Sequence, residues 1–204
     1  MTVDTPLPVR QASAPGTGAG PRSGGAKARV LETADRLFSD EGIRVVGVDR
    51  LIAESSVTKA TFYKHFGAKD TLVLHYLGRR HDREVAELDE ITGEAADAAG
   101  ALRDLVDGLA ARLQKPGFRG SPFANAAAEF SDPTHAVRTL ISEHREWQAG
   151  AWADLFQRAG HPMAGDAADD LQLAVDGAEL GAYAGDAIAS VASLRRTLER
   201  LLAA

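Results

Sequence analysis

The sequence of 204 residues contains no cysteine. This absence excludes disulfide bonds, thiolate metal sites and sensing by thiol oxidation. The sequence also lacks the run of about 18 apolar residues that a membrane-spanning helix requires. Its first 25 residues lack the apolar stretch of a secretory signal. We therefore expect a cytoplasmic protein with no membrane partner, and a hydrophobic content of 45% is sufficient for a buried core.

Patterns typical of catalysis and metal binding are also missing. The six histidines do not cluster: His75 and His81 are six residues apart and His135 and His144 nine, spacings that put each pair on different faces of a helix. The sequence holds no nucleophile elbow, phosphate-binding loop or catalytic pair of carboxylates. We therefore predict that the protein is not an enzyme and that it uses no cofactor and no metal.

The net charge of −6 is unevenly distributed along the chain. Residues 1–77 carry ten Lys and Arg against eight Asp and Glu, whereas residues 78–204 carry thirteen against twenty-one. Residues 56–69 hold three lysines and no acidic residue. Such a cationic patch on an acidic chain is typical of contact with nucleic acid, but an ordinary solvated surface accounts for the charge equally well.

Residues 1–25 hold four prolines and five glycines, a composition that predicts a disordered tail. Arg10 and Arg22 are the basic residues that such a tail could place in a DNA minor groove, although a solvated tail is the simpler interpretation. From Lys27 onward apolar residues recur at helical spacing, without the alternation of strands, so we predict an all-α fold. The predicted helices cover residues 27–41, 48–55, 58–66, 69–91, 101–115, 122–130, 134–159, 166–183 and 186–202.

Residues 48–65, VDRLIAESSVTKATFYKH, predict two short helices joined by a tight turn at residues 56–57. Thr58 is placed to cap the second helix, because its hydroxyl can accept a hydrogen bond from a free backbone N–H group. Phe62 and Phe66 lie one turn apart and predict the buried side of that helix.

The other side chains of this second helix are small or polar, whereas a helix that packs on two sides would carry a second apolar stripe. A helix of this kind is typical of a helix-turn-helix, in which the second helix enters the major groove of DNA. The alternative is a generic three-helix module that uses the two phenylalanines for packing only. The predicted exposed side consists of Lys59, Ala60, Thr61, Tyr63, Lys64 and His65.

Four short motifs, which cover about a fifth of the chain, carry a resemblance to a known family. They are Leu37-Phe38 with Gly42, Val48 with Ile52-Ala53, the run TKATFYKHF at residues 58–66, and Lys69 with Leu72. Together they resemble the tetracycline-repressor (TetR) family of transcriptional regulators. Gly47 departs from the Ser or Thr usual in the family before the helix at residues 48–55, so a hydroxyl contact to phosphate expected there would be missing.

The resemblance implies a role for each residue of the motif. Lys59, Thr61 and Lys64 would face DNA bases, while Tyr63 and Lys69 would hold phosphates. The complete set of expected DNA-binding residues is Thr58, Lys59, Ala60, Thr61, Tyr63, Lys64, His65 and Lys69.

The resemblance also implies a domain organisation. A helix-turn-helix DNA-binding domain is expected at residues 26–72, followed by a helical ligand-binding and dimerisation domain at residues 73–204. The expected function is that of a repressor whose homodimer binds a palindromic operator in double-stranded DNA and leaves it when an unknown small-molecule effector binds. The alternatives are an activator or ligand-independent regulator of the same fold, and an all-α scaffold that binds a protein partner and no DNA.

The last two predicted helices carry more apolar residues than a lone surface helix needs. We expect them to form a four-helix interface with a second copy of the chain, although burial within one chain is the alternative. These residues are Leu171, Leu173, Val175, Leu180, Tyr183, Ile188, Val191, Leu194, Leu198, Leu201 and Leu202.

The middle helices offer candidates for the ligand pocket. A polar group among apolar side chains can orient a mainly apolar ligand, and His144 lies on such an apolar seam. The alternative is a core histidine satisfied by a neighbour. Trp152 falls outside the predicted seam and is expected to be partly exposed. The candidate pocket residues are Phe123, Asn125, Phe130, Ile141, His144 and Trp147.

Overall fold

The computed structural model of the chain describes residues 25–204. The tail predicted at residues 1–25, with Arg10 and Arg22, therefore lies outside the described residues except for Gly25. Over residues 25–204 the chain forms nine helices and no strand, which confirms the predicted all-α fold. The helices are α1 (Ala26–Glu41), α2 (Val48–Ser55), α3 (Lys59–Phe66), α4 (Lys69–Glu94), α5 (Ala98–Leu113), α6 (Pro122–Glu129), α7 (Ala136–Arg158), α8 (Ala164–Ala184) and α9 (Ala187–Leu202).

Several helices begin one to three residues from the predicted position, and at α5 and α7 a capping residue sets the first turn. The helix predicted from residue 101 begins at Ala98, where the carboxylate of Asp97 accepts a hydrogen bond of 2.7 Å from the backbone N–H of Gly100. The helix predicted from residue 134 begins at residue 136. Its cap is His135, whose ring accepts a hydrogen bond from the N–H of Val137. In both cases a side-chain acceptor satisfies an N–H group that the helix leaves free.

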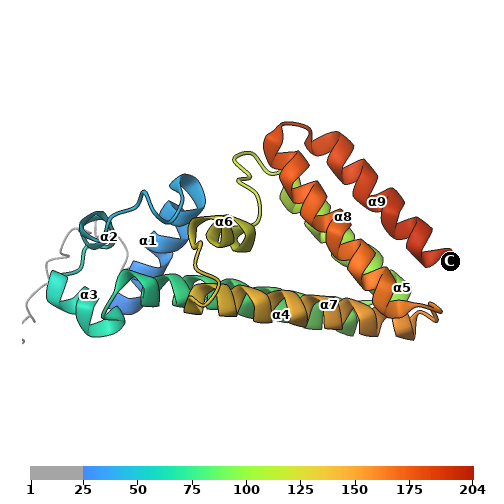
Figure 1. Cartoon of the computed structure of the whole chain (residues 1–204), viewed down its shortest axis with the longest axis horizontal. Helices are drawn as coiled ribbons and strands as arrows, with labels where there is room; N and C mark the ends of the chain where they lie inside the picture. The colour runs from blue at the N-terminus through green and yellow to red at the C-terminus, as the bar shows by residue number, and fades with distance from the viewer. Residues whose placement is uncertain (1–24) are drawn as a thin grey trace, which may run out of the picture.

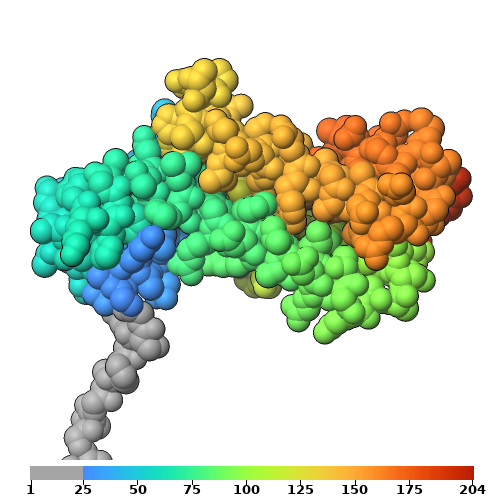
Figure 2. Space-filling model, turned by 90° about the horizontal axis from the view of Figure 1, so that it is seen from below, coloured from blue at the N-terminus to red at the C-terminus, as the bar shows by residue number. Residues whose placement is uncertain are grey.

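The long helices α4 and α7 lie side by side, run in the same direction and form the middle of the molecule (Figure 1). Helices α1 to α3 pack at one end of this pair, and α5, α8 and α9 pack at the other end. The short helix α6 lies between the two groups. Figure 2 shows the same arrangement from below, with α4 and α7 exposed along the middle of one face.

The buried apolar side chains form two clusters. The first joins α1 to α3 with the N-terminal half of α4, with α6 and with the start of α7, through residues such as Leu37, Phe62 and Leu77. The second joins α5, α8 and α9 with the C-terminal half of α7. Leu88 in the later part of α4 packs against this second cluster. Helices α4 and α7 therefore contribute to both clusters and connect the two ends of the molecule.

Trp152 corrects one prediction. The expectation that this side chain is partly exposed is wrong, because only 2% of its surface is exposed and it packs in the second cluster. Trp152 lies eleven residues after Ile141, and eleven residues are close to three turns of an α-helix. The two side chains therefore share the buried side of α7.

The apolar residues of the last two helices divide between the inside and the surface of the chain. Val191, Leu194 and Leu198 are buried in the second cluster, as the alternative of intramolecular burial expects. Leu180 and Ile188, in contrast, are 68% and 80% exposed. Leu173 and Tyr183 on α8 are exposed as well. Helices α8 and α9 thus combine a packed side with an exposed apolar surface formed by Leu173, Leu180, Tyr183 and Ile188.

Candidate nucleic-acid interface and effector cavity

The turn between α2 and α3 is held by backbone and side-chain hydrogen bonds. Ser56 takes the left-handed conformation (φ 53°), and its N–H donates to the carbonyl of Ala53 over 3.2 Å. Thr58 then caps α3, because its Oγ1 accepts a hydrogen bond of 3.1 Å from the backbone N–H of Thr61. The predicted cap is therefore confirmed, and the two helices meet at a tight, fixed turn.

Two phenylalanines fix the orientation of α3. Phe62 is fully buried and Phe66 nearly so, and their ring centroids lie 5.5 Å apart. The predicted buried side is therefore confirmed. Because this side is anchored in the first cluster, the opposite side of α3 is presented to solvent, and Tyr63 on it is 44% exposed. The exposed residues at the start and along this side are Thr58, Lys59, Ala60, Tyr63, Lys64 and His65, and Thr61 is partly buried.

Basic side chains flank this exposed side of α3. Lys59 Nζ lies 3.8 Å from an Asp49 carboxylate oxygen, and both side chains are well exposed, so the attraction is weak. Lys69, at the start of α4, donates over 3.4 Å to the backbone carbonyl of Arg44. Partial burial lowers the pKa of the Lys69 ammonium, and the carboxylates of Glu129 and Asp70 oppose that shift. Lys59, Lys64 and Lys69 thus place three basic side chains on α3 or next to it.

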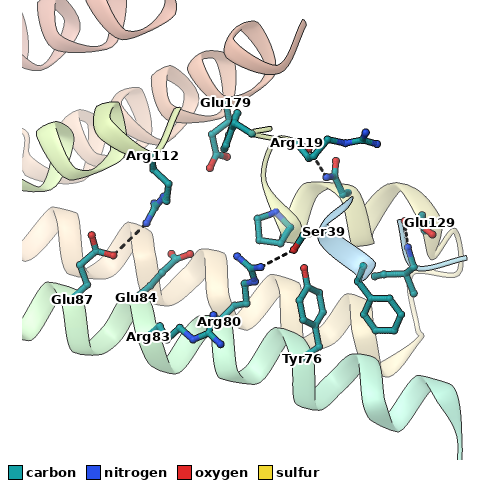
Figure 3. A pocket seen from close by; sticks show the side chains of 16 residues that line it. Ser39, Tyr76, Arg80, Arg83, Glu84, Glu87, Arg112, Arg119, Glu129 and Glu179 are labelled. Atoms are coloured by element: carbon teal, nitrogen blue, oxygen red, sulfur yellow. Dashed lines mark hydrogen bonds and ion pairs between the residues drawn. The ribbon is translucent and has the colours of Figure 1, made fainter. Parts of the chain in front are cut away.

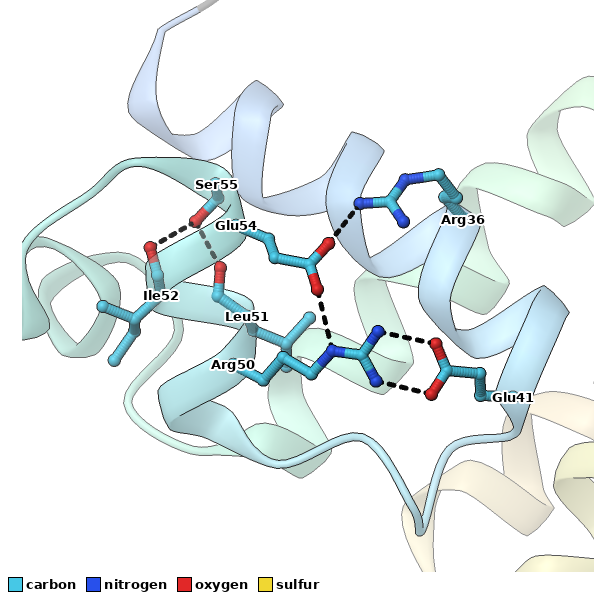
Figure 4. Close-up of polar contacts among 7 residues, drawn as sticks. All are labelled: Arg36, Glu41, Arg50, Leu51, Ile52, Glu54 and Ser55. Carbon is cyan, nitrogen blue, oxygen red and sulfur yellow. Dashed lines mark hydrogen bonds and ion pairs between the residues drawn. The ribbon is translucent and has the colours of Figure 1, made fainter.

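A network of ion pairs sets α2 against α1 (Figure 4). The Arg50 guanidinium donates to both carboxylate oxygens of Glu41 over 2.5 and 2.7 Å, and to Glu54 over 2.7 Å. Glu54 also accepts from Arg36 of α1. Hydrogen bonds from Arg50 lower the pKa of Glu41 below its usual range. The bidentate geometry fixes direction as well as distance, so it orients α2 and the turn that follows it. Gly47 is the N-cap of α2 and provides no side-chain hydrogen bond.

Glu129, at the end of α6, connects the middle of the molecule to the loop between α1 and α2. One oxygen of its carboxylate accepts from the backbone N–H of Ile43 over 2.9 Å, and the other accepts from the N–H of Arg44 over 2.5 Å. A second connection comes from α4, where Arg80 forms a hydrogen bond with Asp35 of α1 over 3.1 Å. Two helices outside α1 to α3 therefore hold the position of α1 and its loop.

Three of the six predicted pocket residues line one cavity. Phe123, Ile141 and His144 face a cavity of about 260 Å³ between α4, α5, α6, α7 and α8. His144 is 4% exposed and its ring stacks on Phe123 with centroids 3.6 Å apart. Its Nδ1 lies 3.1 Å from Nδ1 of His81, so each ring has a hydrogen-bonding neighbour. Burial, with smaller contributions from neighbouring His81 and Arg145, lowers the pKa of His144 to about 4, so the ring is neutral at pH 7.

The other three predicted pocket residues lie elsewhere. Asn125 lines a neighbouring cavity of about 360 Å³, where its side chain donates to the carbonyl of Arg119 over 2.8 Å. Trp147 lines a small cavity of about 30 Å³ between α4, α5 and α7. Phe130 lines a separate depression that Lys69 also lines. The Phe130 ring contacts the His135 ring. The structure thus distributes the predicted set over four hollows.

Charged residues that the sequence did not single out lie at the centre of this region. Glu84 of α4, Arg112 of α5 and Glu179 of α8 line both the 260 Å³ cavity and the 360 Å³ cavity. Figure 3 shows the carboxyl groups of Glu84 and Glu179 directed into the hollow from opposite sides. Glu84 lies seven residues after the buried Leu77, and seven residues bring a side chain back to the same face of a helix. This spacing is the sequence signal that could have identified Glu84.

Burial changes the acidity of both carboxyl groups. The pKa of Glu179 is raised to about 7, mainly by burial. Arg112 and the Ser121 hydroxyl oppose this rise, and neighbouring Glu84 and Asp176 contribute to it. Burial likewise raises the pKa of Glu84. Moving a carboxylate out of water disfavours its charged form, which explains the common direction.

Within residues 25–204, no three or more His, Asp and Glu side chains are arranged to hold a metal ion. Among the helices that the structure describes, none has the length and apolar character needed to cross a membrane.

Comparisons with known proteins identify relatives of the chain. Residues 30–76 match the family model described as bacterial regulatory proteins, tetR family. The HTH-type transcriptional regulator LmrA of Bacillus subtilis (strain 168) is 28% identical over 148 residues, which cover 67% of this chain and 74% of LmrA.

Solved structures extend the similarity to nearly the whole chain. The TetR-family regulator SCO4454 of Streptomyces coelicolor is 35% identical, with a TM-score of 0.84 over 87% of this chain and 94% of SCO4454. A cysteine mutant of the TetR-family regulator CifR, solved with 26-base-pair operator DNA, is 19% identical, with a TM-score of 0.74 over 88% of this chain and 98% of CifR. At 19% identity CifR supports the fold alone, whereas the 35% identity to SCO4454 extends over most of both chains. The chain belongs to the TetR family of transcriptional regulators and carries the family's DNA-binding helix-turn-helix.

Proposed function

We propose that the protein is a homodimeric repressor that binds a palindromic operator and leaves it when a small molecule binds between its middle helices. The observation that carries the proposal is the asymmetry of α3: Phe62 and Phe66 are anchored in the core, while Lys59, Tyr63 and Lys64 are exposed. A helix held in this way can enter a major groove without losing its packing. Thr58, Lys59, Ala60, Thr61, Tyr63, Lys64, His65 and Lys69 are the proposed DNA contacts.

The exposed apolar surface of α8 and α9 supports the dimer. Leu173 and Leu180 are seven residues apart on one face of α8, and Ile188 follows on α9. An exposed apolar surface of this kind marks a contact with another protein, and a two-fold axis makes the same surface serve both copies. Two copies would present two α3 helices, which fits a palindromic operator.

The two proposed functions, DNA binding and effector binding, are assigned to opposite ends of the molecule. Residues 26–72 would bind DNA, while residues 73–204 would bind the effector and the second copy. Helix α4 belongs to both apolar clusters, and Glu129 ties α6 to the loop before α2. An effector that favours one arrangement of α4 and α6 would therefore change the separation of the two α3 helices. A coupling free energy of about 1–3 kcal/mol suffices to change operator occupancy substantially.

Selection from random double-stranded DNA tests this proposal. Full-length protein is incubated with the pool, bound DNA is amplified over several rounds, and the enriched sequences are compared. An enriched palindrome with half-sites about one helical turn apart is the expected result. A reporter driven by that operator then distinguishes repression from activation. Enrichment of no sequence would favour the alternative of a scaffold that binds protein and no DNA.

A further inference from the structure

The cavity between α4, α5, α6, α7 and α8 is lined by both acidic and basic side chains. Five of its residues are formally charged: Glu84, Arg112, Arg145, Asp176 and Glu179. Arg112 pairs with Glu87 over 3.3 Å, and Arg145 pairs with Asp176 over 2.8 Å. Within the described chain, no arginine or lysine lies within ion-pair distance of Glu84 or Glu179. The arginines of the wall are therefore engaged elsewhere, while the carboxyl groups of Glu84 and Glu179 have no arginine or lysine within ion-pair distance.

The cations of the neighbouring cavity are engaged as well. Arg80 and Arg83 both face Asp35 of α1. The Arg119 guanidinium lies over the Tyr183 ring, 5.5 Å from its centroid. His144, whose Nε2 lies 3.6 Å from a carboxylate oxygen of Glu84, is held neutral by its burial. The surroundings of Glu84 and Glu179 thus favour a positive charge and disfavour an additional negative one.

Gln172 gives an independent indication of the same chemistry. This side chain lines the cavity from α8, is only 7% exposed, and donates through Nε2 to Asp176 over 3.4 Å. Its Oε1 is buried and has no hydrogen-bond partner among residues 25–204. A buried acceptor without a donor costs free energy, so a ligand that brings an N–H group to it is favoured.

The rest of the wall is apolar. A ligand body would contact Leu109, Phe123, Ala124, Ala127, Ile141 and Val175. The cavity of about 260 Å³ shares Glu84, Arg112 and Glu179 with the neighbouring one of about 360 Å³, which gives room for a small organic molecule.

From this arrangement we infer that the effector is an apolar organic amine whose positive charge is held by Glu84 and Glu179 and whose N–H groups include the donor for Gln172. The inference rests on the proposed function, because it names the chemical class of the molecule that acts at the effector site. Carboxylates hold the charge, Gln172 accepts a hydrogen bond, and the apolar wall of α6, α7 and α8 excludes water from both.

A series of three probes with one scaffold tests the inference. Binding of 4-phenylbutylamine, 4-phenylbutanol and 4-phenylbutyrate to the full-length protein is measured by calorimetry at about pH 8, above the Glu179 pKa of about 7. We expect the amine to bind at least about tenfold more tightly than the alcohol, which corresponds to about 1.4 kcal/mol, and the acid to bind most weakly. Equal binding of amine and alcohol, tighter binding of the acid, or no amine binding up to millimolar concentration would each overturn the inference. This comparison requires no substitution.

Isosteric variants locate the charge recognition. Glu84→Gln and Glu179→Gln should each reduce the preference for amine over alcohol by about tenfold, since each removes one negative charge and keeps the shape. Glu143→Gln, on the exposed side of α7, is the matched control and should keep the full preference. A preference that persists in both folded cavity variants would show that other groups select the amine.

A parallel DNA-binding assay separates this inference from the proposed function. If the protein binds a selected operator but does not prefer the amine, the inference fails and DNA regulation stands. If the protein prefers the amine but binds no DNA sequence, the proposed function fails and the cavity chemistry stands.

Discussion

The carboxylate of Glu129 and the backbone N–H of Ile43, separated by 86 positions in the chain, form a hydrogen bond of 2.9 Å. The bond joins the last residue of α6 to the loop that leads from α1 into α2. Phe123, near the start of α6, lines the cavity proposed for the effector. A displacement of α6 by a ligand would therefore reach the helix-turn-helix through this contact.

Removing the Glu129 carboxylate should weaken both stability and coupling. We expect Glu129→Ala to lower the free energy of unfolding by about 1–3 kcal/mol, because two backbone N–H groups lose their acceptor. The same variant should reduce the effect of an effector amine on operator affinity. Urea unfolding and DNA titrations with and without 4-phenylbutylamine measure the two effects. Glu143→Ala on exposed α7 is the control, and an unchanged amine effect in Glu129→Ala would refute the proposed coupling.

Glu179 should make stability depend on pH. Its pKa is about 7 in the folded protein against an ordinary 4.5, so the folded state binds the proton more tightly. Stability from this group is then present below pH 4.5 and is lost as pH rises through 7. The loss should be on the order of 1–3 kcal/mol. Urea unfolding at several pH values should show a flatter profile for Glu179→Gln than for the wild type. Identical profiles would mean that the Glu179 carboxyl titrates normally.

The exposed apolar surface of α8 and α9 should hold the dimer. Replacing Leu180 and Ile188 together by Glu should give a monomer in light scattering and a large loss of operator affinity. At a two-fold interface the new carboxylates of one copy would be buried next to those of the other copy, and like charges repel. The fold should persist, since both side chains are largely exposed within one chain. Met163→Glu introduces the same charge at an exposed apolar residue at the other end of α8 and should leave the dimer intact. A dimeric double variant would assign the interface to another surface.

The sequence predicted most of the helices and the helix-turn-helix because those features depend on local spacing. Thr58 is an example, since its role as a cap depends only on the next three residues. The exposure of Trp152 was predicted wrongly, because the buried side of α7 had to be followed over three turns. The sequence alone thus identified the helices and the Thr58 cap, whereas the caps Asp97 and His135, which set the starts of α5 and α7, were missed.

The cavity that we propose for the effector was only partly predictable. Phe123, Ile141 and His144 were found through apolar spacing. Glu84 and Glu179 were missed, since charged residues on helices usually face solvent. Their importance depends on the packing of five helices around them, and this packing cannot be predicted from any single segment of the sequence. The pairing of His81 with His144 was missed for the same reason, because the two rings come from different helices.

The central claim is that the exposed side of α3 and the start of α4 bind DNA. A gel-shift titration of a selected operator over a series of salt concentrations, with wild type, Tyr63→Ala and Lys69→Ala, tests it most directly. Lys115→Ala, an exposed lysine beyond α5, is the matched control. We predict weaker binding of all DNA sequences by both α3–α4 variants, and for Lys69→Ala a salt slope reduced by about 1, because one phosphate contact is lost. Affinities and slopes equal to those of wild type and Lys115→Ala would contradict the account.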